Sequence, residues 1–143
     1  MQKTYDLERF VKAQEHDYPV ALREMRAGHK ESHWIWYIFP QLKGLGHTDY
    51  ATYYGIEDAD EARAYLAHPV LGARLREITE AILQLDNYDP EYLMGGHPDD
   101  WKLNSCLTLF AYISEEDSVF HRALEKFFWG EMDTKTLKRL QHQ

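Results

Sequence analysis

The chain has 143 residues, of which 44% are hydrophobic and 28% charged, and its formal net charge at pH 7 is -8. This length suits one domain whose core needs neither disulfides nor metals for stability. An acidic chain with scattered Lys and Arg residues is a poor partner for nucleic acid polymers, because their affinity comes from cations that neutralise phosphates. The sequence shows no long apolar run and no charged-then-apolar leader. We therefore expect a cytoplasmic protein that neither enters membranes nor is secreted.

The first 28 residues predict two short helices with a break near Pro19. Asp6 is a good N-cap residue for the first helix, and Gly28 can end the second, because glycine readily adopts a left-handed conformation. Proline fits the first position of a helix, where its missing N–H has no intrahelical partner to lose. We therefore expect helices to begin at Pro19, Pro69, Pro90 and Pro98.

Residues 33–39 are the ambiguous segment of the chain. The run is short and aromatic, and Pro40 stops it, so a strand is one interpretation. Ser32 is a good N-cap residue and the rest of the chain has helical patterns, which favours a short helix.

The rest of the chain has apolar residues at helical intervals and polar residues suited to helix starts. The clearest helix is 69–85, where Leu71, Leu75, Ile78, Ile82 and Leu85 share one face. Thr48, Asp58 and Asp133 are N-cap candidates for three other helices. Helices are also expected at 98–113 and 119–128. The sequence thus predicts a single all-α domain, 1–143, as a compact array of about seven to nine short helices.

Four stretches of the chain resemble a bacterial family catalogued as domain of unknown function 1810. They are residues 32–46, 62–71, 99–103 and 107–110, and the first contains the unusual string Ser-His-Trp-Ile-Trp-Tyr-Ile-Phe-Pro-Gln-Leu. The resemblance covers almost the whole chain. Members are sometimes labelled calpastatin, although nothing here is typical of a disordered protease inhibitor. The resemblance implies a compact all-α fold and brings no established activity.

The aromatic segment is also the best candidate for a binding site. If 33–39 is helical, His33, Trp36 and Tyr37 fall near one face, and the Ile and Phe residues can enter the core. An indole and a phenol beside an imidazole suit stacking on a planar ring such as a nucleobase. The alternative is that both Trp34 and Trp36 belong to the core, with His33 bonded to a backbone carbonyl.

The following loop could bind an anion. Lys43, Gly44, Gly46 and His47 precede the expected N-cap Thr48, and glycines allow backbone N–H groups to converge on a negative charge. The spacing is not that of a phosphate-binding P-loop, and two glycines also suit an ordinary turn. Among the tyrosines that follow, Tyr54 is the one we include in the expected site.

Helix 98–113 carries a polar stripe within an otherwise apolar pattern. Asp100, Asn104 and Thr108 recur every four residues, with Lys102 and Ser105 beside them. Such a stripe must be hydrogen-bonded inside the protein or to a bound molecule. If the site is catalytic, His33 and Asp100 are the best acid and base, provided that the fold brings them together.

Metal and thiol chemistry are not expected. His29, Glu31 and His33 lack the spacing of known zinc motifs, and a metal needs three or four convergent ligands. Cys106 is the single cysteine, so it cannot form an internal disulfide, and its apolar neighbours indicate a buried thiol. We assign no metal site, and no cofactor can be named.

The leading hypothesis is a protein that binds a small, partly anionic, planar ligand such as a nucleotide derivative. The expected ligand-binding residues are Trp36, Tyr37, Gln41, Lys43, Gly44, Gly46, His47, Tyr54, Lys102 and Ser105. One alternative is a hydrolase or transferase that uses His33 and Asp100. Another is a protein-interaction module with exposed anchors among Trp34, Trp36, Trp101 and Trp129. The sequence leaves the oligomeric state open.

Overall fold

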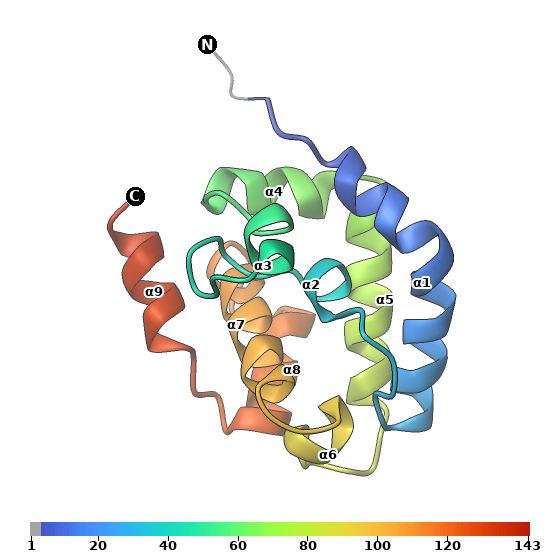
Figure 1. Cartoon of the computed structure of the whole chain (residues 1–143). Coiled ribbons are helices and arrows are strands. Elements are labelled where there is room, and N and C mark those ends of the chain that lie inside the picture. Colours follow the sequence, from blue (N-terminus) through green and yellow to red (C-terminus); the bar gives the residue numbers. More distant parts are fainter. Residues whose placement is uncertain (1–3) are drawn as a thin grey trace.

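Helices and short loops make up nearly all of the molecule (Figure 1). The computed structural model describes residues 4–143, and within this range there are nine helices. They are α1 (Glu8–Ala27), α2 (Ile35–Ile38), α3 (Asp49–Tyr53), α4 (Ala59–Ala67), α5 (Leu71–Leu83), α6 (Pro90–Met94), α7 (Asp99–Tyr112), α8 (Val119–Phe128) and α9 (Thr134–Gln141). The predicted all-α class is confirmed, and none of these helices is long and apolar enough to cross a bilayer.

Helix α7 is the centre of the fold. It contacts α2, α4, α6, α8 and α9, and its second half is buried on nearly every side. Cys106 lies in this buried half, where loss of hydration raises the pKa of its thiol. Helices α1 and α5 pack along each other at one side of the molecule, and α9 lies on the opposite side (Figure 1).

Four polar side chains fix the helix starts that the sequence indicated. Thr48 accepts a hydrogen bond from the backbone N–H of Ala51. In the same way, Asp58 accepts from the N–H of Glu61, and Asp133 accepts from the N–H of Thr136. His68 Nδ1 accepts from the N–H groups of Val70 and Leu71 before α5 begins. These residues satisfy donors that have no partner inside the helix.

The expected break at Pro19 is wrong, because α1 runs through it. The buried residues Phe10, Gln14, Tyr18, Ala21 and Met25 form one stripe that extends on both sides of the proline. A proline inside a helix costs about 3 kcal/mol. The continuous burial of this stripe against neighbouring helices offsets that cost.

The other three prolines lie near helix starts. Pro90 is the first residue of α6, Pro98 immediately precedes α7, and Pro69 lies in the turn before α5. The short-helix interpretation of 33–39 is confirmed as α2, but Ser32 is not its N-cap, because the helix begins after Trp34. The hydroxyl of Ser32 instead donates to Glu24.

An isolated parallel bridge between Leu42 and Ile56 holds the loop that follows α2. Lys43 N–H donates to the carbonyl of Ile56 at 2.7 Å, and Ile56 N–H donates to the carbonyl of Gln41 at 2.8 Å. The loop 41–46 is thereby fixed against the core, where it approaches the start of α7.

Candidate functional site

Trp34 is a core residue whose polar atom is fully used. Its side chain is 1% exposed, and its Nε1 donates to Glu24 at 2.9 Å. The same carboxylate accepts from the backbone N–H groups of Glu31 and Ser32 and from the Ser32 hydroxyl. Burial works against ionisation of Glu24, but these hydrogen bonds outweigh it and lower its pKa to about 2. Lys30 Nζ lies 5.0 Å from the centre of the Trp34 ring.

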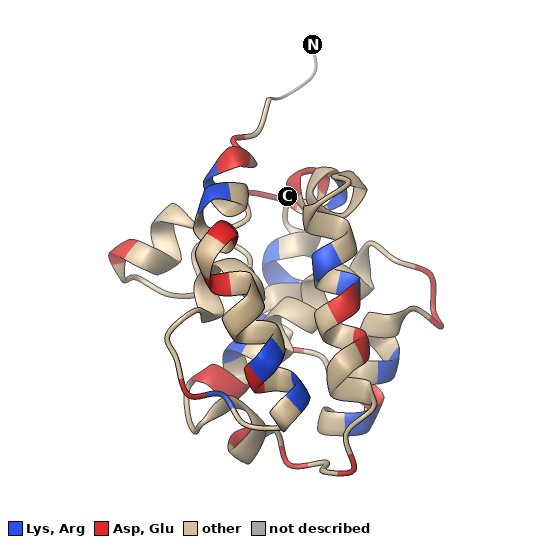
Figure 2. Cartoon of the chain, turned by 90° about the vertical axis from the view of Figure 1, so that its right-hand side faces the viewer, with Lys and Arg blue, Asp and Glu red and all other residues tan. Residues whose placement is uncertain are grey.

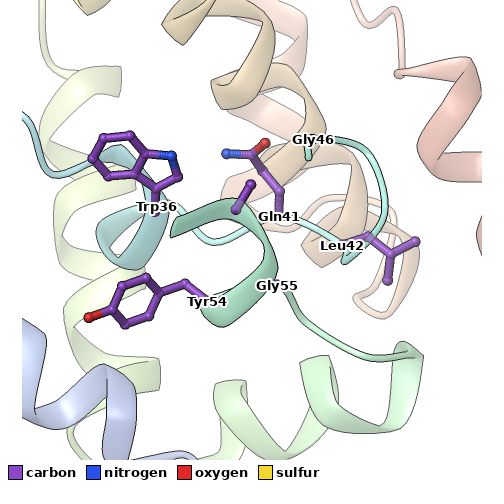
Figure 3. A pocket seen from close by; sticks show the side chains of 7 residues that line it. Trp36, Gln41, Leu42, Gly46, Tyr54 and Gly55 are labelled. Atoms are coloured by element: carbon purple, nitrogen blue, oxygen red, sulfur yellow. The ribbon is translucent and has the colours of Figure 1, made fainter. Parts of the chain in front are cut away.

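Trp36, two residues later, is half-buried, and its indole nitrogen lacks the hydrogen bond that Trp34 makes. Its ring stacks on Tyr50 at 4.7 Å between centroids, and Lys102 Nζ lies 5.3 Å from its centre. Its Nε1 is buried and has no hydrogen-bond partner among residues 4–143. Figure 3 shows this nitrogen pointing toward the side-chain amide of Gln41. A buried donor without an acceptor costs about 1–3 kcal/mol, so it marks a place that packing alone does not explain.

Gln41 and Gly46 line two cavities of very different size. The Trp36 cavity has a volume of about 10 Å³, room for one water molecule, and its lining includes Trp36, Gln41, Gly46 and Tyr54. The second, which we call the α7–α9 cavity, has a volume of about 310 Å³. Its lining residues are Gln41, Leu45, Gly46, Pro98, Trp101, Lys102, Ser105, Asp133, Thr134 and Lys135. Only the second has the size of a ligand pocket.

Three segments without any carboxylate converge on the α7–α9 cavity. They are residues 32–48, 101–114 and 134–143, and each contributes lining residues. By contrast, α1 and α5 present both signs of charge close together (Figure 2). In a chain with net charge -8, this convergence produces a local environment that favours an anion.

One carboxylate, Asp133, lines this cavity, and a second, Asp99, lies beside the lining residue Lys102. Asp99 lies between Lys30, at 2.8 Å, and Lys102, at 3.6 Å, so two ammonium groups share one negative charge. Asp133 accepts from the backbone N–H of Thr136 at 3.1 Å and from the Thr136 hydroxyl. The lining thus holds two lysines, Lys102 and Lys135, against the one negative charge of Asp133.

Several residues predicted for the site lie elsewhere. Tyr37 is buried, its hydroxyl donates to Asp17, and its side chain lines neither cavity. Gly44 packs against Arg139, whose Nε donates to the carbonyl of Lys43 at 3.1 Å. His33 and His47 are exposed and line neither cavity.

Asp100 is held by a different histidine from the one predicted. His97 Nδ1 lies 2.8 Å from Asp100 Oδ1, and this hydrogen bond raises the pKa of His97. The His97 ring also stacks on Trp101 at 4.7 Å between centroids. The pairing orients the histidine at the N-terminal end of α7, beside the cavity that Trp101 lines.

The polar stripe of α7 is hydrogen-bonded inside the protein. The Thr108 hydroxyl donates to Asn104 at 2.9 Å and accepts from the N–H of Asp133. Asn104 donates to the carbonyl of Glu131, and Ser105 Oγ lies 3.1 Å from the carbonyl of Trp101. The stripe thus fixes the segment that precedes α9, and with it one wall of the α7–α9 cavity.

The family model described as protein of unknown function (DUF1810) matches residues 4–140. The chain belongs to this family. It is also similar to the crystal structure of the conserved hypothetical protein Rv1873 from Mycobacterium tuberculosis, with 43% sequence identity and a TM-score of 0.92. That match covers 96% of this chain and 97% of the other. None of the curated proteins compared matches the chain.

Membership of this DUF1810 family confirms the resemblance noted in the sequence and leaves the function to be argued from the site. Six residues that line the cavity were not among the predicted site residues, and two of these six, Trp101 and Lys135, offer an indole and an ammonium group. Trp101 lies on the exposed face of an otherwise buried helix, and it is 62% exposed. An exposed Trp at the start of an apolar helix is the signal that could have identified it.

Proposed function

We propose that this protein binds a small, partly anionic, planar ligand, such as a nucleotide derivative, in the α7–α9 cavity. The observation that carries the proposal is the combination of Trp101 with Lys102 and Lys135 around a cavity of about 310 Å³. An exposed indole offers a face for stacking, and ammonium groups attract a negative charge. Gln41 adds an amide that can donate to and accept from a ring edge.

This assignment moves the stacking residue from α2 to α7. The Trp36 ring is already stacked on Tyr50, and the cavity beside it holds no more than one water molecule. Trp36 therefore supports the site from behind, through its contact with Lys102. The ligand meets Trp101, Lys102 and Lys135, which all line the larger cavity.

Isothermal titration calorimetry with adenosine and adenosine monophosphate tests the proposal. We expect the monophosphate to bind more tightly than the nucleoside, and Lys102→Gln to weaken its binding about tenfold through loss of a charge-assisted contact. Trp101→Ala should also weaken binding. The matched control is Trp129→Ala, because Trp129 is 85% exposed and does not line the cavity.

Two results would remove this function. One is the absence of binding by adenosine monophosphate and by uridine monophosphate to a protein that melts cooperatively. The other is an equal loss of affinity in Trp101→Ala and Trp129→Ala, which would show that exposed indoles bind these probes without a site.

A further inference from the structure

Helix α9 presents a row of basic residues, and the proposed pocket uses only the first of them, Lys135. Lys135, Lys138, Arg139 and His142 stand at spacings i, i+3, i+4 and i+7, which place them on one face of the helix. All four are exposed, and none of them is in an ion pair within the described part of the chain. Lys138 and Arg139 lie in the last turn of α9, where the helix dipole favours positive charge. The row therefore presents unpaired positive charge to solvent along one face of α9.

The row of basic residues on α9 extends along two hollows of the surface. Lys135 lines the α7–α9 cavity, and Lys138, Arg139 and His142 line a second hollow of about 380 Å³ further along the helix. With a rise of about 1.5 Å per residue, the row extends for about 10 Å from Lys135 to His142. An anion chain that begins in the first cavity can therefore continue along the same face.

Arg139 is held in place by the glycine loop. Its Nε donates to the carbonyl of Lys43 at 3.1 Å, and a Cβ at Gly44 would collide with its guanidinium group. Gly44 has φ +99°, a conformation that other residues rarely adopt. The loop thus acts as a cradle for Arg139, and a pre-positioned guanidinium binds phosphate oxygens with less loss of side-chain entropy.

We infer that the ligand is a polyanion, such as a nucleoside di- or triphosphate, whose phosphates extend from the α7–α9 cavity along Lys135, Lys138 and Arg139. This inference rests on the proposed function, because the planar part of the ligand occupies the site beside Trp101. It also gives the Lys43–Gly44 loop a role: the loop positions a cation and does not bind the anion through its own N–H groups.

The test compares three probes, adenosine monophosphate, adenosine triphosphate and inorganic tripolyphosphate, by calorimetry on the full chain without divalent cations. We expect the nucleoside triphosphate to bind about tenfold more tightly than the monophosphate, because it gains charge-assisted hydrogen bonds. The double variant Lys138→Gln/Arg139→Gln should remove this advantage and leave the monophosphate affinity unchanged. Arg23→Gln, an exposed arginine on α1, is the matched control and should change neither affinity.

Two contrary patterns separate the inference from the function on which it rests. Equal affinities for mono- and triphosphate, unaffected by the double variant, would overturn the inference and leave the planar-ligand function standing. Binding of tripolyphosphate that depends on Arg139, with no binding of the monophosphate, would remove the planar-ligand function and overturn the nucleoside part of the inference, leaving α9 as a site for phosphate alone. Loss of triphosphate binding in Arg23→Gln would overturn the inference by showing general charge attraction.

Discussion

Trp34 and Trp36 are two residues apart and have opposite roles in the molecule. Trp34 donates its indole N–H to the Glu24 carboxylate, which accepts four hydrogen bonds in all. We call this group of residues the Glu24 centre. Trp36 is half-buried, and its indole N–H finds no acceptor among residues 4–143. The difference shows that aromatic content alone does not mark a site. The unsatisfied donor of Trp36, with Gln41 and Lys102 beside it, lies at the wall of the site proposed above (Figure 3).

The largest effect should come from removing the Glu24 carboxylate. Glu24→Ala leaves the Trp34 indole, the Ser32 hydroxyl and two backbone N–H groups without their acceptor. We expect a loss of about 3–5 kcal/mol in the free energy of unfolding, measured by urea denaturation. A loss below about 1 kcal/mol would mean that this centre is not what orders the aromatic segment.

The two indoles themselves provide a direct comparison. Trp34→Phe removes a hydrogen bond to an ionised group and should cost about 2–3 kcal/mol. Trp36→Phe removes a donor that has no partner and should cost about 1 kcal/mol or less. Equal losses in urea denaturation of the two variants would contradict the distinction between them.

Acid should weaken the Glu24 centre specifically. The pKa of Glu24 is about 2 in the folded protein, below the ordinary value of 4.5. Its contribution to stability is therefore complete above about pH 4.5 and is lost as the pH falls toward 2. We expect the stability difference between the native chain and Glu24→Gln to shrink by about 2 kcal/mol between pH 6 and pH 3. A pH-independent difference between the two proteins would contradict the lowered pKa.

The smallest effect on stability should come from Gln41→Glu, which tests the surroundings of Trp36. A carboxylate opposite Trp36 Nε1 supplies an acceptor and should change the free energy of unfolding by no more than about 1 kcal/mol. The same carboxylate faces the α7–α9 cavity and should weaken binding of adenosine monophosphate about tenfold through charge repulsion. Gln41→Met, without the charge, is the control. Unchanged affinity in Gln41→Glu would place the ligand away from this wall.

Local patterns were sufficient for most of the helices. Thr48, Asp58 and Asp133 cap α3, α4 and α9 as predicted, because a cap involves atoms only two or three residues apart. The periodicity of 69–85 identified α5 for a similar reason. Pro19 was misjudged because the burial that stabilises α1 around it comes from helices elsewhere in the chain.

The residues that line the α7–α9 cavity were predicted only in part. Gln41, Gly46, Lys102 and Ser105 were expected together, and they line the α7–α9 cavity. His33 was the expected partner of Asp100. In the structure the partner of Asp100 is His97, whose Nδ1 lies 2.8 Å from the Asp100 carboxylate. Trp101, Lys135 and Arg139 could not be assigned from spacing, because the segments that unite them are separated by tens of residues.

The sequence by itself determined the helical class, most helix boundaries and the burial of Cys106, since these depend on periodicity, capping and local hydrophobicity. Only the tertiary structure decided which indole is satisfied and where positive charge gathers. Hydrogen-bond satisfaction and electrostatic potential depend on groups brought together across the whole chain, and no interval along the sequence encodes those distances.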